Sequence, residues 1–184
     1  MLQILNWGMM KQSQGRDMKA STVITALMFG VAFNVSPVQA TPDDEASIKA
    51  LEKRFVDAVN VKDVDGIMKG YVPNESLFVF DVIPPRQYVG AKAYAKDWTD
   101  FFGFFKGPVK FELTDLSVTA DGTIGYRHSI QRVTGTSVKD QPVDLVVRVT
   151  DVYRKINGNW LIVHEHVSVP VDLDTGKPDL SSKP

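Results

Sequence analysis

One stretch decides the fold: Arg148-Val-Thr-Asp-Val-Tyr-Arg-Lys-Ile-Asn-Gly-Asn-Trp-Leu-Ile-Val-His-Glu-His-Val-Ser168. Apolar and polar residues alternate on both sides of Asn157-Gly158, and this dipeptide is typical of two-residue hairpin turns. Because successive side chains of a β-strand point to opposite faces of the sheet, the alternation predicts strands. We expect two long antiparallel strands, over 142–156 and 159–169.

The same alternation continues toward the N-terminus. It predicts strands over 109–119 and 123–134, joined by a second hairpin turn at Asp121-Gly122. Residues 135–141 form a longer loop before the next strand. A short run over 77–81 is also rich in residues that favour strands. The C-terminal half of the chain is therefore expected to be an antiparallel meander.

Helical spacing marks the part of the chain before the meander. Apolar residues recur every three or four positions over 41–59, over 63–71 and over 90–102. Three N-terminal helices that pack on one face of a strongly curved antiparallel sheet give an α+β fold. Such a sheet has a concave side that short helices do not fill, and we expect a small-molecule pocket there.

The composition is that of an ordinary globular domain. Of 184 residues, 43% are hydrophobic and 23% are charged, which is close to the average for soluble domains. The formal net charge of −1 gives no field that would attract nucleic acid, so we expect no nucleic-acid partner. The sequence contains no cysteine, which excludes disulfides, thiolate metal sites and cysteine nucleophiles.

The N-terminal residues have the pattern of a targeting segment. An apolar run over 22–33 follows Lys19, and Val38-Gln39-Ala40 supplies short residues at positions −3 and −1 of a cleavage site. The run is shorter than the roughly 20 residues of a membrane span. We expect a signal peptide over 1–40, of which residues 1–17 could be an upstream extension; a retained interfacial anchor is the alternative.

The expected domain boundaries follow from this segment. A domain over 41–172 would be periplasmic or secreted, with no membrane contact after cleavage of the signal peptide. Residues 173–184 are rich in Asp, Gly, Pro and Ser, and we expect them to form a flexible C-terminal tail.

Titratable residues interrupt the apolar faces of the predicted strands at four positions. They are Asp81, His128, Asp151 and Glu165. An ionised carboxylate is costly to bury alone, so such groups pair, take a raised pKa or face a hydrated cavity. Three acids and an imidazole around one cavity would spread their pKa values and supply a general base or a neutral acid.

Each of these residues also has a plainer interpretation. It could lie at a sheet edge, face solvent or pair with Arg127 or Arg132. His164 and His166 share a strand face and could suggest a metal site, but the sequence offers no obvious third ligand on that face. We therefore expect no metal and no cofactor, and we assign the two histidines to packing or to a subunit interface.

The pocket walls are expected to be mainly aromatic and aliphatic. The residues expected to contact a ligand are Phe55, Tyr88, Trp98, Phe102, Tyr126, Val149 and Val163. Large aromatic side chains in such a domain more often form core or cavity wall than a platform for nucleobases. The sequence contains no phosphate-binding glycine loop, nucleophile elbow or zinc-protease motif.

Two segments resemble a known superfamily. Residues 54–71 look like the paired N-terminal helices of the nuclear-transport-factor-like superfamily, which includes ketosteroid isomerase, SnoaL-like polyketide cyclases and the association domain of calmodulin-dependent kinase. Residues 148–168 are similar to the final hairpin of the SnoaL-like and kinase association domains. The resemblance implies a cone-shaped, cystatin-like roll with a ligand pocket, and a homodimer formed through the outer face of the sheet.

The resemblance also implies roles for single positions. Asp81 matches the place of the general base of ketosteroid isomerase, and Asp151 matches its acid hydrogen-bond donor. The tyrosine donor of the isomerase falls at Phe55, which has no hydroxyl, so an oxyanion would lose one donor. Two arginine positions of the kinase association domain fall at His128 and Asp151, which argues against binding a carboxylate in that manner.

The convergence of titratable residues on apolar faces favours an acid–base enzyme. It would be an isomerase, dehydratase, cyclase or hydrolase that acts on a small, largely apolar substrate. Asp81 would be the general base, Asp151 and His128 would donate or orient hydrogen bonds, and Glu165 would tune them. The alternatives are a non-catalytic module that binds a small ligand and a dimeric assembly domain.

Overall fold

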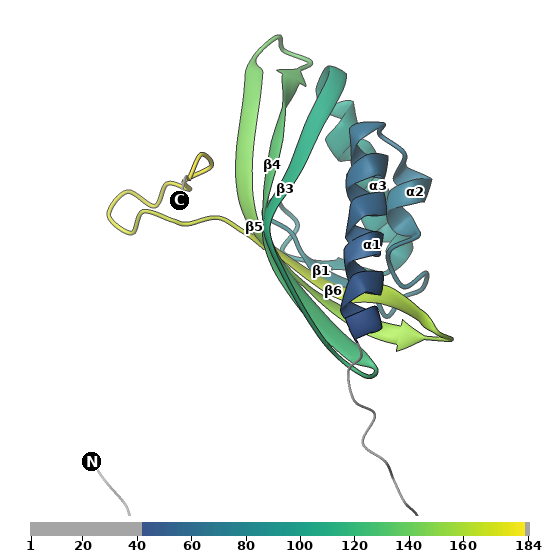
Figure 1. Ribbon diagram of the computed structural model, residues 1–184. Helices are drawn as coiled ribbons and strands as arrows, with labels where there is room; N and C mark the ends of the chain where they lie inside the picture. Colours follow the sequence, from purple (N-terminus) through teal and green to yellow (C-terminus); the bar gives the residue numbers. More distant parts are fainter. Residues whose placement is uncertain (1–41, 183–184) are drawn as a thin grey trace, which may run out of the picture. The chain divides into compact units, whose positions relative to one another are not determined.

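The computed structural model describes residues 42–182, so the expected signal peptide over 1–40 lies outside the described residues. Within them, three helices cover one face of a six-stranded sheet, which confirms the α+β roll (Figure 1). The elements are α1 (Pro42–Asn60), α2 (Val64–Met68), β1 (Phe78–Phe80), β2 (Tyr88–Val89), α3 (Ala91–Gly103), β3 (Phe105–Asp121), β4 (Ile124–Ser137), β5 (Pro142–Ile156) and β6 (Asn159–Ser168). No helix within 42–182 is long and apolar enough to cross a membrane.

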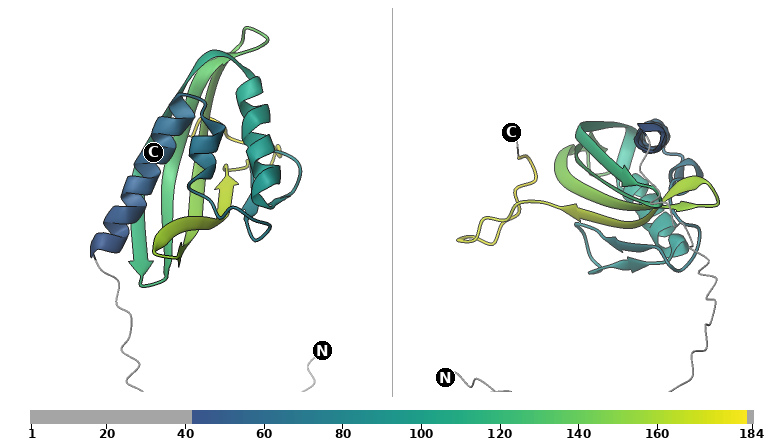
Figure 2. Two further views of the ribbon diagram at one scale, coloured as in Figure 1. Left: turned by 90° about the vertical axis from the view of Figure 1, so that its right-hand side faces the viewer. Right: turned by 60° about the horizontal axis from the view of Figure 1, so that its bottom comes forward.

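The strand order in the sheet is β2-β1-β6-β5-β4-β3. All neighbouring strands are antiparallel except β1 and β6, which run parallel, so the sheet is antiparallel apart from one pair. This pairing brings the chain after β1 beside the middle of β6, although the two segments are far apart in the sequence. Figure 2 shows α1, α2 and α3 side by side over the same face of the sheet.

Both predicted hairpin turns are present, and one of them is shifted by one position. Asn157 and Gly158 both have positive φ, 50° and 82°, which the two-residue turn between β5 and β6 requires. In the other hairpin the turn residues are Gly122 and Thr123, one position later than expected. The strand β3 begins at Phe105 rather than at 109, and two register shifts along it allow a long strand to bend with the sheet.

Polar side chains at both ends of α1 fix it to the sheet. Near its start, the Asp44 carboxylate accepts hydrogen bonds from Lys155 Nζ (2.6 Å) and Trp160 Nε1 (3.1 Å). At its end, Asn60 pairs with the backbone of Phe111, accepting from the N–H at 2.9 Å and donating to the carbonyl at 3.2 Å. The helix is therefore held along its length over the concave face.

The inward face of β4 differs from the sequence expectation. Arg127 and Gln131 are buried, whereas Tyr126 and His128 are exposed on the outer face. The prediction that Tyr126 and His128 face the pocket is therefore wrong. The physical reason is the register of β4 and β5, which places Arg127 directly opposite Asp151. A buried carboxylate needs a counter-ion, and this need outweighs the apolar character of the alternative face.

A bulge in β6 changes its inward face in the same way. Tyr153 of β5 pairs with Ile162, and the register shifts by one residue immediately afterwards at Val163. Trp160 and Ile162 are buried before the bulge, and Glu165 is buried after it. Trp160, Ile162 and Glu165 therefore lie on one buried face although strict alternation would separate them, since an extra residue resets the alternation of a strand.

The C-terminal segment leaves β6 on the side of the sheet opposite to the helices (Figure 1). It bends back on itself through a bridge between Val171 and Pro178, and the Leu180 carbonyl accepts a hydrogen bond from Val146 N at 2.8 Å. The segment thus continues along the edge of β5 beyond the end of β6. Its flexibility stays a prediction.

Candidate functional site

A cavity of about 90 Å³ lies between α3, the concave face of β3 to β6 and the segment that follows β1. Its lining residues are Asp81, Val82, Ile83, Tyr94, Asp97, Trp98, Phe101, Phe111, Gln131, Val133, Leu145, Val147, Glu165 and Val167. Most of these side chains are apolar, and a few polar groups converge among them. That combination is typical of a small-molecule site.

Asp81 is the acid at one wall of this cavity. Its backbone leaves the end of β1, and its side chain is half-buried and accepts a hydrogen bond from Val82 N at 2.5 Å. Its pKa is raised from 3.8 to about 7, chiefly by burial and next by the nearby carboxyl groups of Glu165 and Asp97, against a smaller lowering by backbone N–H groups. A group with this pKa can both accept and donate a proton at neutral pH.

Glu165 lies on β6, next to the strand that leads into Asp81, and is held by two tyrosines. Tyr71 donates a hydrogen bond from its hydroxyl to Oε2 at 2.6 Å, and Tyr94 donates to Oε1. Burial raises the pKa of both tyrosines well above 10, so their hydroxyls remain protonated donors. The carboxyl group of Glu165 is therefore fixed in place rather than free to rotate toward a ligand.

Behind the cavity lies a buried charge cluster around Arg127, whose side chain is fully buried. Nη2 lies 2.5 Å from Asp151 Oδ2 and 3.1 Å from Glu52 Oε2. Nε donates to the Tyr153 hydroxyl at 3.1 Å, and Nη1 donates to Ser129 Oγ. Tyr153 in turn donates to Glu52 Oε1 at 2.5 Å. One guanidinium thus compensates two buried acids.

Acids outnumber the buried cation in this region, and the pKa of Asp151 reflects this. Burial raises it well above 3.8; Arg127 lowers it, while Glu165 and Glu52 raise it again. The pKa of Glu52 is raised as well, chiefly by burial and against the opposing effect of Arg127. Burial and the neighbouring acids therefore oppose the effect of the guanidinium at both carboxyl groups.

Comparison with models of known protein families identifies the family of this chain. The model of the SnoaL-like domain matches residues 48–172. The chain belongs to the SnoaL-like domain family. A search among curated proteins finds no match.

Several solved structures are similar to this chain. A protein of unknown function from Pseudomonas putida KT2440, described as NTF2-like, shares 33% identity over 78% of this chain and 99% of its own, with a TM-score of 0.71. A nuclear transport factor 2-like superfamily protein from Salmonella enterica shares 18% over 76% and 100% (TM-score 0.66). A ketosteroid isomerase-like protein from Erwinia carotovora shares 17% over 70% and 97% (TM-score 0.59). The last two likenesses concern the fold alone.

The SnoaL-like domain brings together two of the four predicted catalytic residues. Asp81 and Glu165 both line the cavity. Asp151 is fully buried but lies behind the cavity wall, where it pairs with Arg127. His128 is exposed on the outer face of the sheet, so it does not belong to this site.

The predicted ligand-contacting residues also divide into groups. Trp98 lines the cavity, and the Tyr88 hydroxyl donates to the lining residue Asp97 at 2.6 Å. Three are buried or half-buried in the surrounding structure: Phe102 and Val149 are buried, and Val163 packs against the core at the bulge. Phe55 is buried and packs edge-on against Trp98 and Phe111, with 5.7 Å between the ring centroids in each pair. Tyr126, with 48% of its surface exposed, points away from the cavity.

Several functional candidates of the SnoaL-like domain are absent from the sequence-based prediction. They are Glu52, Tyr71, Tyr94, Asp97, Arg127 and Gln131. Glu52 had a usable signal, because it lies four residues after Ile48 and so on the apolar stripe of α1. Arg127 was expected only as a possible ion-pair partner of the acids, and its pair with Asp151 confirms that alternative. The tyrosines had no such signal, since tyrosine is common in apolar cores.

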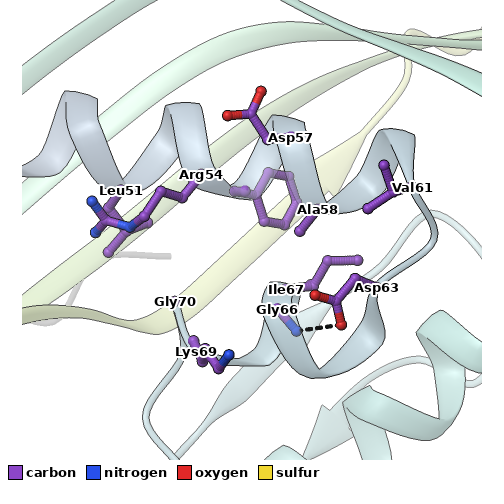
Figure 3. A pocket seen from close by; sticks show the side chains of 11 residues that line it. Leu51, Arg54, Asp57, Ala58, Val61, Asp63, Gly66, Ile67, Lys69 and Gly70 are labelled. Carbon is purple, nitrogen blue, oxygen red and sulfur yellow. Dashed lines mark hydrogen bonds between the residues drawn. The ribbon is translucent and has the colours of Figure 1, made fainter.

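A second, larger hollow of about 440 Å³ lies between α1 and α2 (Figure 3). Its charged side chains include Arg54, Asp57 and Lys69, which are exposed, and Asp63 accepts a hydrogen bond from Gly66 N at 2.9 Å. None of the predicted catalytic residues lines it. The convergence of partly buried acids therefore favours the cavity beside Asp81 as the site of chemistry.

Proposed function

We propose that this SnoaL-like protein is a general acid–base enzyme that acts on a small, largely apolar substrate in the cavity beside Asp81. The reaction class is isomerisation, dehydration, cyclisation or hydrolysis. The observation that carries the proposal is an acid with a pKa of about 7 on an otherwise mostly apolar wall. Enzymes tune general bases to this range by burial and by neighbouring like charges.

Asp81 acts as the general base. In its ionised form it lies near the carboxyl groups of Asp97 and Glu165, so accepting a proton from the substrate relieves like-charge repulsion. The protonated Asp81 then returns the proton at another position of the substrate or to a leaving group. Tyr71 and Tyr94 hold Glu165, and Tyr88 holds Asp97, so that these acids keep their distance from Asp81 fixed.

The size of the cavity limits the substrate. A volume of about 90 Å³ is well below the roughly 300–1,000 Å³ of sites for drug-sized ligands, which favours a ligand with one small ring over a fused polycycle. The buried Phe55, which has no hydroxyl, points in the same direction, because a steroid isomerase of this superfamily would need a donor there. We therefore place steroids outside the proposed substrate class.

The test is turnover of a panel of small cyclic enones and epoxides by the wild type and by Asp81→Asn. The variant keeps the volume of the side chain but removes the base. We expect its kcat to fall by about 10²- to 10⁴-fold on any substrate found. Asp57→Asn, an exposed acid on α1, is the matched control and should keep full activity. Equal rates for wild type and Asp81→Asn would refute the assignment of Asp81 as the base.

A non-catalytic module that binds a small ligand, or a dimeric assembly domain, is the second candidate. It is favoured by the tyrosine hydrogen bonds to both carboxyl oxygens of Glu165. Because these bonds occupy Glu165, Asp81 is left as the principal cavity acid that could react with a substrate. A binding module would gain thermal stability with a ligand that is recovered chemically unchanged. Loss of turnover on Asp81→Asn separates the enzyme from this candidate.

We further propose that the protein is exported and forms a homodimer through the outer face of its sheet. That face carries exposed large side chains, including Phe80, Ile124 and Tyr126. Sedimentation equilibrium tests the dimer, with Tyr126→Asp expected to shift the protein toward monomer. Cell fractionation with and without residues 1–40 tests export.

A further inference from the structure

The segment after β6 forms a hook that is attached to the sheet at both ends, and we use this name for residues 169–180. Before the hook, Ser168 ends the ladder of β6 and lies opposite Arg148 of β5. At its end, the Leu180 carbonyl accepts a hydrogen bond from Val146 N at 2.8 Å, two residues away on the same strand. The hook therefore leaves the sheet and returns to it at one place on β5.

Hydrogen bonds within the hook define its shape. The Asp172 carboxylate accepts hydrogen bonds from the backbone N–H groups of Asp174 (3.0 Å) and Thr175 (2.8 Å). The backbone N–H of Asp172 donates to the Lys177 carbonyl at 3.0 Å, which closes the turn. An aspartate that binds backbone N–H groups two and three residues further on supports a turn locally. The hook thus has hydrogen bonds of its own and does not depend on packing against the sheet.

The hook exposes apolar side chains. Every residue from 171 to 181 is exposed, and the segment stands away from the sheet on the side opposite to the helices (Figure 1 and Figure 2). Leu173 is 94% exposed, which is more than any other large apolar side chain within residues 42–182. Eleven large apolar side chains are exposed in this range, and six of them lie on the hook or on the outer face of the sheet: Val171, Leu173, Leu180, Phe80, Ile124 and Tyr126. Exposed apolar side chains that gather on one side of a molecule indicate an interaction surface.

The hook and the outer face also have opposite charges. The hook carries three acids and one base, which are Asp172, Asp174, Asp179 and Lys177. On the outer side of β5, Asp144 is paired with Arg132 at 2.8 Å, whereas Arg148 and Arg154 are exposed. An acidic segment and a basic surface attract and orient each other. The charges therefore favour a contact between a hook and an outer face.

We propose that the hook of each subunit packs on the outer face of a second copy of this chain. The inference rests on the homodimer of the proposed function, and it names a segment that each subunit contributes to its partner. In a two-fold dimer a contact between hook and outer face occurs twice, because each subunit presents the same surfaces. Since the hook projects on the side of the outer face, it reaches a partner that docks there without rearrangement of the domain.

The first test measures dimerisation of the full-length protein by sedimentation equilibrium. Leu173→Ser removes the most exposed apolar side chain of the hook, and we expect the Kd of the dimer to rise about tenfold or more. Raising the ionic strength should also weaken the dimer, because the charges on the hook and on the outer face are then screened. Val61→Ser, at a position that is 73% exposed in the turn after α1, is the matched control and should dimerise as the wild type does.

The second test locates the hook by paramagnetic broadening between subunits. The sequence has no cysteine, so Lys177→Cys gives a single site for a nitroxide spin label on the hook. Spin-labelled protein without ¹⁵N is mixed with ¹⁵N-labelled wild type, so any broadened amide signal belongs to the partner of the labelled chain. We expect broadening at Tyr126, His128, Thr150 and His166 on the outer face. The amide signals of α1 should stay sharp, and reduction of the nitroxide should restore the others.

The outcomes separate this inference from the proposals on which it rests. If Tyr126→Asp dissociated the dimer while Leu173→Ser did not, the dimer would stand and the role of the hook would be refuted. Broadening on the helices, or no broadening between the subunits of a dimer, would refute it as well. A wild type that stays monomeric at all concentrations would overturn both the dimer and the hook contact, and would leave the assignment of Asp81 untouched.

Discussion

The concave face contains two adjacent groups of buried acids, which meet where Asp151 lies opposite Glu165 and which are compensated differently. In the first group, which we call the charge cluster, a single guanidinium holds two carboxyl groups: the cluster consists of Glu52, Arg127 and Asp151. The second group is the cavity acids, which accept hydrogen bonds from hydroxyl groups and backbone N–H groups: they are Asp81, Asp97 and Glu165. The acids of the charge cluster are buried away from any ligand, whereas Asp81 lines the cavity and has a pKa of about 7.

A buried acid that is paired with a cation mainly contributes to the structure. A buried acid whose neighbours are only hydroxyl and N–H groups is available for proton transfer. An ion pair in the interior stabilises little relative to an apolar core, but loss of one partner is costly. The acids of both groups have raised pKa values, but only Asp81 is partly exposed and lies on a cavity wall, where a pKa of about 7 lets it exchange protons with a ligand near neutral pH. The predictions below test each side of this contrast.

The largest effect should come from removing the cation of the charge cluster. Arg127→Met leaves Glu52 and Asp151 without their counter-ion, and we expect the free energy of unfolding to fall by about 3–5 kcal/mol. Urea denaturation measures it. Arg132→Met is the matched control, because Arg132 makes a two-bond pair with Asp144 on the exposed face of the same strand. Comparable losses in the two variants would remove the distinction between buried and exposed pairs.

A smaller effect is expected from the cavity acid, and it depends on pH. The pKa of Asp81 is about 7 in the folded protein against an ordinary value of 3.8, so the folded state binds this proton more tightly. The free energy of unfolding therefore falls as the pH rises from about 4 to about 7. Asp81→Asn lacks this loss and should exceed the wild type above pH 7 by on the order of 2 kcal/mol more than it does at pH 4.

Urea denaturation at several pH values measures this difference, with the exposed Asp57→Asn as the control. A stability difference between Asp81→Asn and the wild type that stays constant from pH 4 to pH 8 would contradict the raised pKa.

The support of Glu165 should contribute less. Tyr71→Phe removes the hydroxyl that donates to Oε2 and leaves the ring in the core, and we expect a loss of about 1 kcal/mol. Because Glu165 then rotates more freely near Asp81, the pH profile of activity should broaden or shift as well. Thermal unfolding and a pH–rate profile measure the two effects. An unchanged stability would mean that this hydrogen bond does not hold Glu165.

The smallest effect is expected on the outer face. His128→Ala changes an exposed side chain that points away from the cavity, so stability should stay within about 0.5 kcal/mol of the wild type. Turnover on any substrate found should be unchanged within twofold. A large loss of turnover would restore the role that the sequence suggested for His128.

The periodicities of the sequence were sufficient for the fold. Helical spacing and strand alternation placed all three helices and the four long strands, and Asn157-Gly158 fixed the register of the last hairpin. The site was predictable where alternation is unbroken, as at Asp151, and after the β1 segment at Asp81. Both residues interrupt apolar runs that the burial of neighbouring residues bears out.

The other site residues could not be predicted, because their orientation depends on the register between strands and a periodic pattern does not determine that register. The two faces of β4 have similar apolar character, so the choice between Arg127 and His128 as the inward residue required the pairing with Asp151. In β6, the bulge at Val163 exchanges faces in mid-strand, and nothing in the alternation marks its position.

The most direct test is an NMR titration of the Asp81 carboxyl carbon in the ¹³C-labelled protein, assigned by comparison with Asp81→Asn. An acid that is buried beside Asp97 and Glu165 and held by backbone N–H groups should titrate with a midpoint of about 7. A midpoint near the ordinary value of 3.8 would show that Asp81 is solvated and ionised at neutral pH, and would contradict the contrast between the charge cluster and the cavity acids.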